Sequence, residues 1–268
     1  MYEDFAVERS QPAIGMVVPH DMALDRELWR WVPEELTMLL TRTPYSPLGE
    51  VNPEMVLDLS DPEMVARTAT DLVTVEPLAY GYACTSGSFI NGVAGEHAIA
   101  DAITTTTGRP AVTTSGALVM AMDALGIHRV AVATPYDIEL GAAFERYLHE
   151  VGVGVAAIRN LGLTQNIWRV GYRQTYDLLR GVDRADADAV LLCCTNLATY
   201  DLIAELEHSL GKPVITANQA TVWATLRVAG YCAMGAGQRL LDHDRDCVVP
   251  LAGEADPGHP GHLLRSPA

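Results

Sequence analysis

Apolar residues fall along this chain in two kinds of pattern. Short runs are apolar at almost every position, which predicts strands buried on both faces. Longer stretches between them repeat apolar residues at about every third or fourth position, which predicts helices with one buried face. The predicted strands span residues 14–18, 36–40, 78–84, 111–113, 130–134, 153–158, 189–194 and 214–216. The predicted helices span residues 24–31, 61–72, 95–105, 116–125, 137–151, 170–179, 202–210 and 220–229.

Strands and helices that alternate in this way are typical of an α/β protein with parallel sheets covered by helices on both faces. Local signals agree with this interpretation. Asp61 and Pro62 favour a helix start as cap and first-turn residue, and Gly126 favours a helix end. The stretch 251–268 is rich in proline, glycine and histidine, which predicts a flexible tail.

Composition and charge narrow the function classes. The 268 residues are 49% hydrophobic, so a large core can be buried. A net charge of −16 repels phosphate backbones, which argues against nucleic acid as a partner, and an anionic substrate would need a local positive field. No apolar stretch reaches the roughly 18–20 residues that span a bilayer, and the first residues are polar, unlike a secretory signal. We therefore expect no membrane partner and a cytoplasmic location.

The five cysteines have neither a disulfide framework nor metal-ligand spacing. This pattern indicates reduced thiols and no zinc site. The chain also lacks the glycine-rich loops that bind nucleotides, and no metal, flavin, nicotinamide or pyridoxal phosphate site is evident. We expect an enzyme without a cofactor, and we interpret Cys193, Cys232 and Cys247 as structural.

The other two cysteines share a local pattern. Cys84 is followed by Thr85 and Ser86, and Cys194 by Thr195 and Asn196, each time after a predicted apolar strand. Ligands of open α/β sheets bind at the carboxyl ends of strands. N–H groups at a following helix start would lower the thiol pKa, and together with the hydroxyl and amide groups they could hold a carboxylate. The competing interpretation is that each cysteine only packs in the core.

Six short segments, in this order, resemble the aspartate/glutamate racemase superfamily and within it the maleate cis–trans isomerase and arylmalonate decarboxylase branch. They are residues 15–19, 83–88, 114–117, 133–136, 194–197 and 218–220. The loop 19–25 and the segment 28–31 are also similar to the family member found with ectoine-degradation genes.

The resemblance implies two similar α/β halves related by a pseudo-twofold axis, with the site between them. On this basis the first half is expected to comprise residues 1–113 plus 214–250 and to carry Cys84. The second half is expected to comprise residues 114–213 and to carry Cys194. Residues 251–268 would form the tail.

The resemblance also implies the chemistry. In racemases of the family, one cysteine removes the α-proton and the other returns it on the opposite face. In maleate isomerases, one cysteine adds to the double bond, and in arylmalonate decarboxylases only the second cysteine is kept. Tyr136 would donate a hydrogen bond to the substrate, and Asn166 would be an amide donor. Their alternatives are an aromatic residue at a strand end and a turn residue.

One loop departs from the isomerase pattern. Where maleate isomerases carry an Asn after the first strand, this chain has His20 and Asp21. An Asp would repel a dicarboxylate, so the substrate is expected to carry an amino group or only one carboxylate. Arg42 is a candidate cation for a carboxylate, with a surface salt bridge as the alternative.

These observations predict a cofactor-independent isomerase of a small carboxylate, most similar to maleate cis–trans isomerase, which converts maleate to fumarate. Two alternatives stay open: a racemase or decarboxylase of an amino acid or malonate derivative, and a non-catalytic binding protein. The predicted site consists of Cys84 and Cys194 as catalytic residues and Asp21, Arg42, Thr85, Ser86, Tyr136, Asn166, Thr195 and Asn196 as substrate contacts. A homo-oligomer, either a dimer or a tetramer, is expected.

Overall fold

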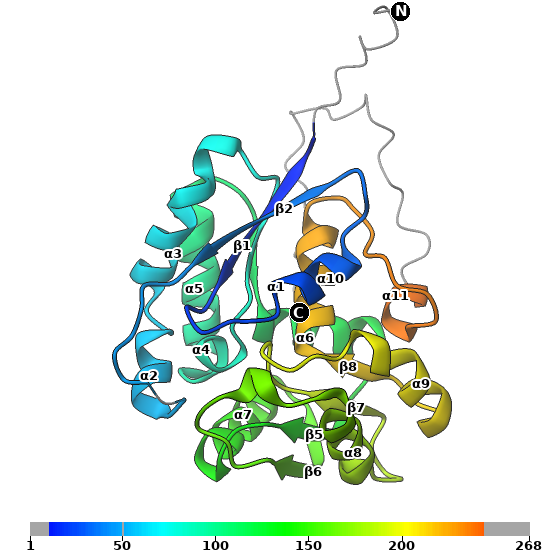
Figure 1. The fold of residues 1–268 in the computed structure, drawn as a ribbon. Coiled ribbons are helices and arrows are strands. Elements are labelled where there is room, and N and C mark those ends of the chain that lie inside the picture. Colours follow the sequence, from blue (N-terminus) through cyan, green and yellow to red (C-terminus); the bar gives the residue numbers. More distant parts are fainter. Residues whose placement is uncertain (1–10, 50, 244–268) are drawn as a thin grey trace, which may run out of the picture.

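The computed structural model describes residues 11–49 and 51–243, which form two four-stranded parallel sheets (Figure 1). The first sheet has the order β2-β1-β3-β4, and the second has the order β6-β5-β7-β8. The strands of the first sheet are β1 Ala13–Val18, β2 Thr37–Arg42, β3 Tyr80–Tyr82 and β4 Ala111–Thr113. Those of the second are β5 Arg129–Thr134, β6 Gly154–Asn160, β7 Ala189–Leu192 and β8 Val214–Thr216. The predicted α/β fold class with two similar halves is confirmed.

The second sheet repeats the first, because β5, β6, β7 and β8 take the places of β1, β2, β3 and β4. The repeat extends to the helices that follow the last strand of each sheet. These are α6 (Thr114–Ala124) after β4 and α10 (Ala217–Val228) after β8, and they pack against each other at the centre of the molecule. Equivalent helices in mutual contact are what a pseudo-twofold axis between the halves requires.

The other helices cover the sheets. Those between the strands of the first sheet are α1 Asp25–Leu28, η2 Trp29–Trp31, α2 Pro53–Asp58, α3 Pro62–Ala69, η3 Thr70–Val75, α4 Thr85–Phe89 and α5 Gly92–Thr107. Those between the strands of the second are α7 Ile138–Glu150, η4 Ile167–Arg169, α8 Tyr172–Val182 and α9 Tyr200–Leu210, and α11 Arg239–His243 follows α10. No described helix is both long and apolar enough to cross a membrane.

The division of the chain into halves differs from expectation at one strand. Residues 214–216 were expected in the first half, but β8 pairs with β7 and lies in the second sheet. The next helix, α10, returns to the first sheet and contacts β3 and β4. The remaining domain boundaries stay a proposal, and the predicted tail at 251–268 lies outside the described residues.

Buried polar contacts hold the loop after β1 against the second half. The Glu27 carboxylate accepts hydrogen bonds from the Thr199 N–H (2.6 Å), the Thr199 hydroxyl (2.9 Å) and the Asn218 amide (3.3 Å). The Thr195 hydroxyl donates to the Ala83 carbonyl at 3.1 Å. These bonds join segments more than a hundred residues apart, and they fix the edges of both sheets at which the strands end.

Candidate active site

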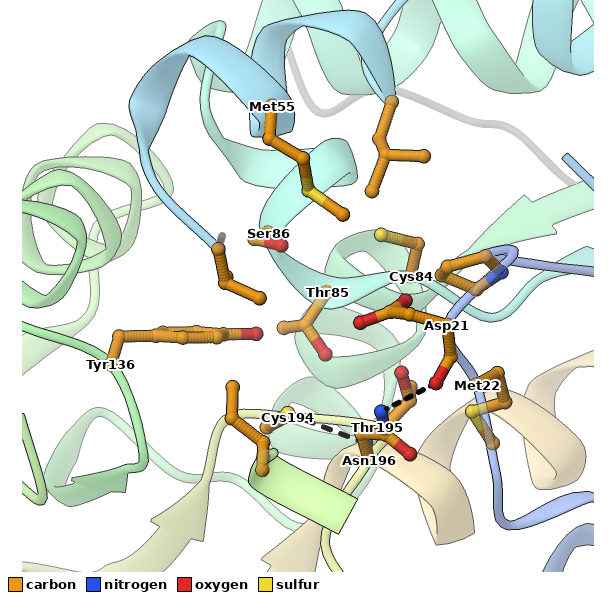
Figure 2. Close-up of a pocket in the computed structure, with 14 residues that line it drawn as sticks. Asp21, Met22, Met55, Cys84, Thr85, Ser86, Tyr136, Cys194, Thr195 and Asn196 are labelled. Carbon is orange, nitrogen blue, oxygen red and sulfur yellow. Dashed lines mark hydrogen bonds between the residues drawn. The ribbon is translucent and has the colours of Figure 1, made fainter. Parts of the chain in front are cut away.

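A pocket lies between the two halves, at the carboxyl ends of the central strands (Figure 2). Its cavity volume is about 30 Å³, which is room for roughly two waters at 10–15 Å³ each. Fourteen residues line it: Pro19, Asp21, Met22, Val51, Met55, Leu59, Cys84, Thr85, Ser86, Tyr136, Ile167, Cys194, Thr195 and Asn196. Both predicted catalytic cysteines are therefore in the same pocket.

Cys84 lies two residues beyond β3, as the N-cap of the short helix α4. Its sulfur is within hydrogen-bond reach of the Gly87 N–H and the Tyr82 hydroxyl. Residue 87 has to be glycine here. A Cβ at that position would lie 2.8 Å from the Leu59 carbonyl oxygen and 3.1 Å from the Cys84 sulfur. The missing side chain lets the helix start approach the thiol closely.

Cys194 occupies the equivalent position after β7 in the second half. The Asn196 N–H donates a hydrogen bond to its sulfur at 3.3 Å, and the Tyr136 hydroxyl is a second donor. Cys193 is also fully buried, but it does not line the pocket. The sequence prediction that Cys193 is structural and Cys194 faces the site agrees with this arrangement.

The thiols differ from prediction in their acidity. Burial raises the pKa of Cys84 to about 11, against the lowering effect of the Gly87 N–H and the Tyr82 hydroxyl. Burial likewise raises the pKa of Cys194 to about 12, against the hydrogen bonds from the Asn196 N–H and Tyr136. The predicted pKa-lowering by helix starts is present, but desolvation of the thiolate outweighs it. Both thiols are protonated at neutral pH in this pocket.

Hydroxyl and amide donors surround the cysteines as predicted. The Thr85 hydroxyl is completely buried and has no hydrogen-bond partner in the structure. Ser86 and Tyr136 line the same side, and Figure 2 shows the Tyr136 hydroxyl directed into the pocket. A buried hydroxyl without a partner costs about 1–3 kcal/mol, which a substrate carboxylate at Thr85 would relieve.

Two predicted substrate contacts lie elsewhere. Asn166 is exposed and does not line the pocket; its neighbour Ile167 does. Arg42 donates to the carbonyls of Pro19 (3.3 Å) and Met22 (2.8 Å) and forms an ion pair with Asp25. Its guanidinium thus supports the loop after β1. The structure brings neither Asn166 nor Arg42 into the pocket lining, and their contact with substrate stays a prediction.

Asp21 is the only acidic residue of the pocket lining, and no Lys, Arg or His belongs to that lining within the described part of the chain. Burial of the carboxyl raises the pKa of Asp21, against the lowering effect of His20 and Arg42, although the residue as a whole is exposed to solvent. The same carboxylate acts to raise the pKa of both Cys84 and Cys194, which indicates that it lies near both sulfurs. The pocket therefore has a negative rather than a positive local field.

The sequence interpretation did not identify the apolar part of the lining. Val51, Met55 and Leu59 come from α2 and its flanks, and α2 was not predicted. A signal was present, because Asn52 and Pro53 form the same cap and first-turn pair that marked the start of α3.

The sequence also predicted reduced cysteines and no metal site. Cys232 is disulfide-bonded, so the expectation of reduced thiols does not hold for this residue. Cys84, Cys193 and Cys194 are free. Among residues 11–49 and 51–243, no cluster of three or more His, Cys, Asp or Glu side chains could hold a metal ion.

The chain is similar to known enzymes. The family described as arylmalonate decarboxylase matches residues 56–241. The chain is 33% identical to an arylmalonate decarboxylase of Bordetella bronchiseptica, over 83% of this chain and 92% of that protein. It is 28% identical to a maleate isomerase of Nocardia farcinica, over 86% of this chain and 96% of that protein.

The same similarity holds for a solved structure. A liganded arylmalonate decarboxylase variant, in which a glycine is replaced by cysteine and a cysteine by serine, superposes with a TM-score of 0.79 at 32% identity. The match covers 86% of this chain and 99% of that one.

Proposed function

Because this chain belongs to the arylmalonate decarboxylase family, we propose that it is a cofactor-independent isomerase that acts on a small carboxylate through Cys84 and Cys194. The observation that carries the proposal is that the two halves each contribute one free cysteine to the same pocket. The maleate isomerase of Nocardia farcinica, which aligns over most of the chain, supports isomerisation as the reaction class.

The substrate carboxylate would bind at the donors beside the cysteines. Thr85 offers a hydroxyl that has no other partner. Tyr136 offers a second hydroxyl, which also lies within reach of the Cys194 sulfur. When charge moves onto the carboxylate in the transition state, these fixed donors stabilise it. The buried Ser88–Ser115 hydrogen bond of 2.7 Å, together with a bond of 2.9 Å from Ser88 to the Thr85 carbonyl, holds the turn that presents Thr85.

Two isomerisations use such a pair of sulfurs. In the first, one cysteine as thiolate takes the α-proton; the C–H electron pair passes into the carboxylate as an enediolate. The other thiol then gives its proton to the opposite face, so one thiol and one thiolate are regenerated. In the second, a thiolate adds to a C=C bond, the resulting single bond rotates, and the thiolate leaves again. Both leave the number of protons on the enzyme unchanged.

Either route needs one thiolate, whereas burial keeps both thiols protonated. One thiol must therefore release its proton to solvent as the substrate binds, and the N–H groups of Gly87 and Asn196 are positioned to stabilise the thiolate once it forms.

Replacement of each cysteine tests the proposal. Cys84→Ser and Cys194→Ser should each lower kcat by about 10³-fold or more if the reaction is proton transfer, because that route uses both sulfurs. Thiol addition requires a loss of this size only for the cysteine that attacks the double bond. The measurement is proton NMR in heavy water with maleate, aspartate, glutamate and other amino acids. Deuterium at the α-carbon indicates proton transfer, and conversion without deuterium indicates thiol addition. Cys193→Ser is the matched control and should retain activity. Full activity of both catalytic-site variants would refute the proposal.

Decarboxylation of a malonate derivative is a second candidate, since an arylmalonate decarboxylase is 33% identical to the chain. Release of carbon dioxide from an arylmalonate that persists in Cys84→Ser but disappears in Cys194→Ser would favour it over isomerisation. The cytoplasmic location and the homo-oligomer expected from the sequence remain part of the proposal.

A further inference from the structure

The negative charge of Asp21 in the pocket affects which substrates can bind. Resting on the proposed function, we propose that Asp21 makes the enzyme select a small monocarboxylate that carries a positively charged amino group, rather than a dicarboxylate such as maleate. Asp21 would be a specificity-determining residue that pairs with the ammonium, while the carboxylate binds at Thr85 and Tyr136.

The Asp21 carboxylate is available for such a pair. Apart from its own backbone N–H, it has no hydrogen-bond or ion-pair partner among the described residues. His20 and Arg42 lie near enough to lower the pKa of the Asp21 carboxyl, but neither makes a hydrogen bond or ion pair with it. Arg42 is paired with Asp25 and loop carbonyls, and the His20 ring packs edge-on against Tyr45. Figure 2 shows the carboxylate directed into the pocket, on the side of Cys84 and Thr85.

The loop that carries Asp21 is fixed on both sides. The Asn196 side chain donates to the Asp21 carbonyl at 3.0 Å and accepts from the Ala23 N–H at 3.1 Å. Arg42 donates to the Met22 carbonyl at 2.8 Å from the other side. A carboxylate on a backbone pinned in this way cannot easily turn away from a second negative charge in the pocket.

Charge counting then favours a cationic group on the substrate. With a dicarboxylate bound, the pocket would hold Asp21, two substrate carboxylates and one thiolate, with no lining Lys, Arg or His. An ammonium in place of one carboxylate changes the substrate charge from −2 to zero. A nearby cation also favours formation of the thiolate, whereas a second anion opposes it.

Calorimetric titration with a matched pair of probes tests this inference on the full-length protein. Succinate and β-alanine have the same two-carbon spacing after the first carboxylate, and they differ in a carboxylate against an ammonium. The wild type should bind β-alanine at least about tenfold more tightly than succinate. Asp21→Asn should weaken β-alanine and strengthen succinate, so that the ratio of affinities falls by about 10- to 100-fold.

Two variants serve as controls for charge and folding. Glu54→Gln removes one negative charge from an exposed position of α2 outside the lining and should leave the ratio unchanged. Asp21→Glu keeps the carboxylate and should keep the preference for β-alanine. A wild type that prefers succinate, or an affinity ratio that Asp21→Asn does not alter, would overturn the inference.

The same variants separate this inference from the proposed function. If Cys84→Ser and Cys194→Ser lose turnover while wild-type maleate turnover is fast and succinate binds best, the two-cysteine function stands and the role of Asp21 fails. If β-alanine is preferred through Asp21 but neither cysteine affects turnover, selection by Asp21 stands and the two-cysteine function fails.

Discussion

Three hydrogen-bonding groups act on the Cys84 thiol and two on the Cys194 thiol, yet both thiols have a pKa well above the 9.0 of an ordinary thiol. Such groups lower the energy of a thiolate, but full burial removes its whole hydration shell. At the residue scale, the pocket therefore holds two neutral thiols, and the proposed chemistry requires that a thiolate form when a ligand binds.

Alkylation measures this directly. A thiol with a pKa of about 11 has roughly a hundredfold less thiolate at pH 8 than one with a pKa of 9.0. Iodoacetamide should therefore label Cys84 and Cys194 slowly at pH 8 and faster as the pH rises beyond 10. Peptide mapping by mass spectrometry identifies each site, and Cys84→Ser isolates Cys194. Rapid labelling whose rate is half-maximal below pH 8 would contradict the raised pKa values of the two thiols.

At the scale of elements, the site depends on how the loop after β1 and the short helix α1 are held. Glu27 in α1 is buried and is the acceptor for Thr199, which precedes α9, and for Asn218 in α10. Burial raises its carboxyl pKa, and these hydrogen bonds act in the opposite direction. One side chain thus connects the first half to the segment that follows Cys194.

Removal of this acceptor should destabilise the protein. Glu27→Ala leaves the Thr199 N–H buried without a partner and removes one of the two acceptors of the Asn218 amide, whose other acceptor is the Leu197 carbonyl. This should lower the free energy of unfolding by about 2–4 kcal/mol. Urea unfolding followed by circular dichroism provides the measurement. Glu34→Ala, an exposed glutamate nearby, is the control and should change stability by less than about 0.5 kcal/mol. Equal stability of the two variants would show that the Glu27 contacts do not matter.

Hydrophobic patterning predicted all eight strand positions to within a few residues. The central strands β1, β3, β5 and β7 are almost completely buried, and the partly buried edge strands β2 and β6 still contain runs of apolar residues. The patterning missed α2 and α4, since helices of six and five residues are too short to show a repeat. The cysteines were predicted from repeated residue types. The positions of Arg42 and Asn166 outside the pocket lining could not be predicted, because they depend on the ion pair of Arg42 with Asp25 and on the exposure of Asn166 in the folded chain.

At the scale of the whole molecule, the chain carries a net charge of −16, and several carboxylates are buried. Burial raises the carboxyl pKa of Glu27, Glu96 and Glu207 above the ordinary 4.5. The folded protein then binds more protons than the unfolded chain. Its free energy of unfolding falls as the pH rises from about 4.5 through the raised pKa values. Repulsion among surface carboxylates acts in the same direction.

Mild acidification should therefore stabilise the protein. We expect the Tm to rise by several degrees between pH 8 and pH 5.5, and added salt at pH 8 to raise it as well by screening. Calorimetric scans across this range provide the measurement. Glu96→Gln keeps an acceptor for the Thr113 hydroxyl and should flatten the pH dependence, whereas Glu54→Gln, at an exposed site, should not. A Tm that falls steadily from pH 8 to pH 5.5 would refute this account.

The small volume between the halves also governs how fast a ligand is captured. A four-carbon acid is larger than the two waters for which there is room, so the walls must part before it can occupy the centre. Raising the ligand concentration then speeds binding only until each opening of the pocket leads to capture. Beyond that concentration the binding rate stays constant and equals the rate at which the pocket opens.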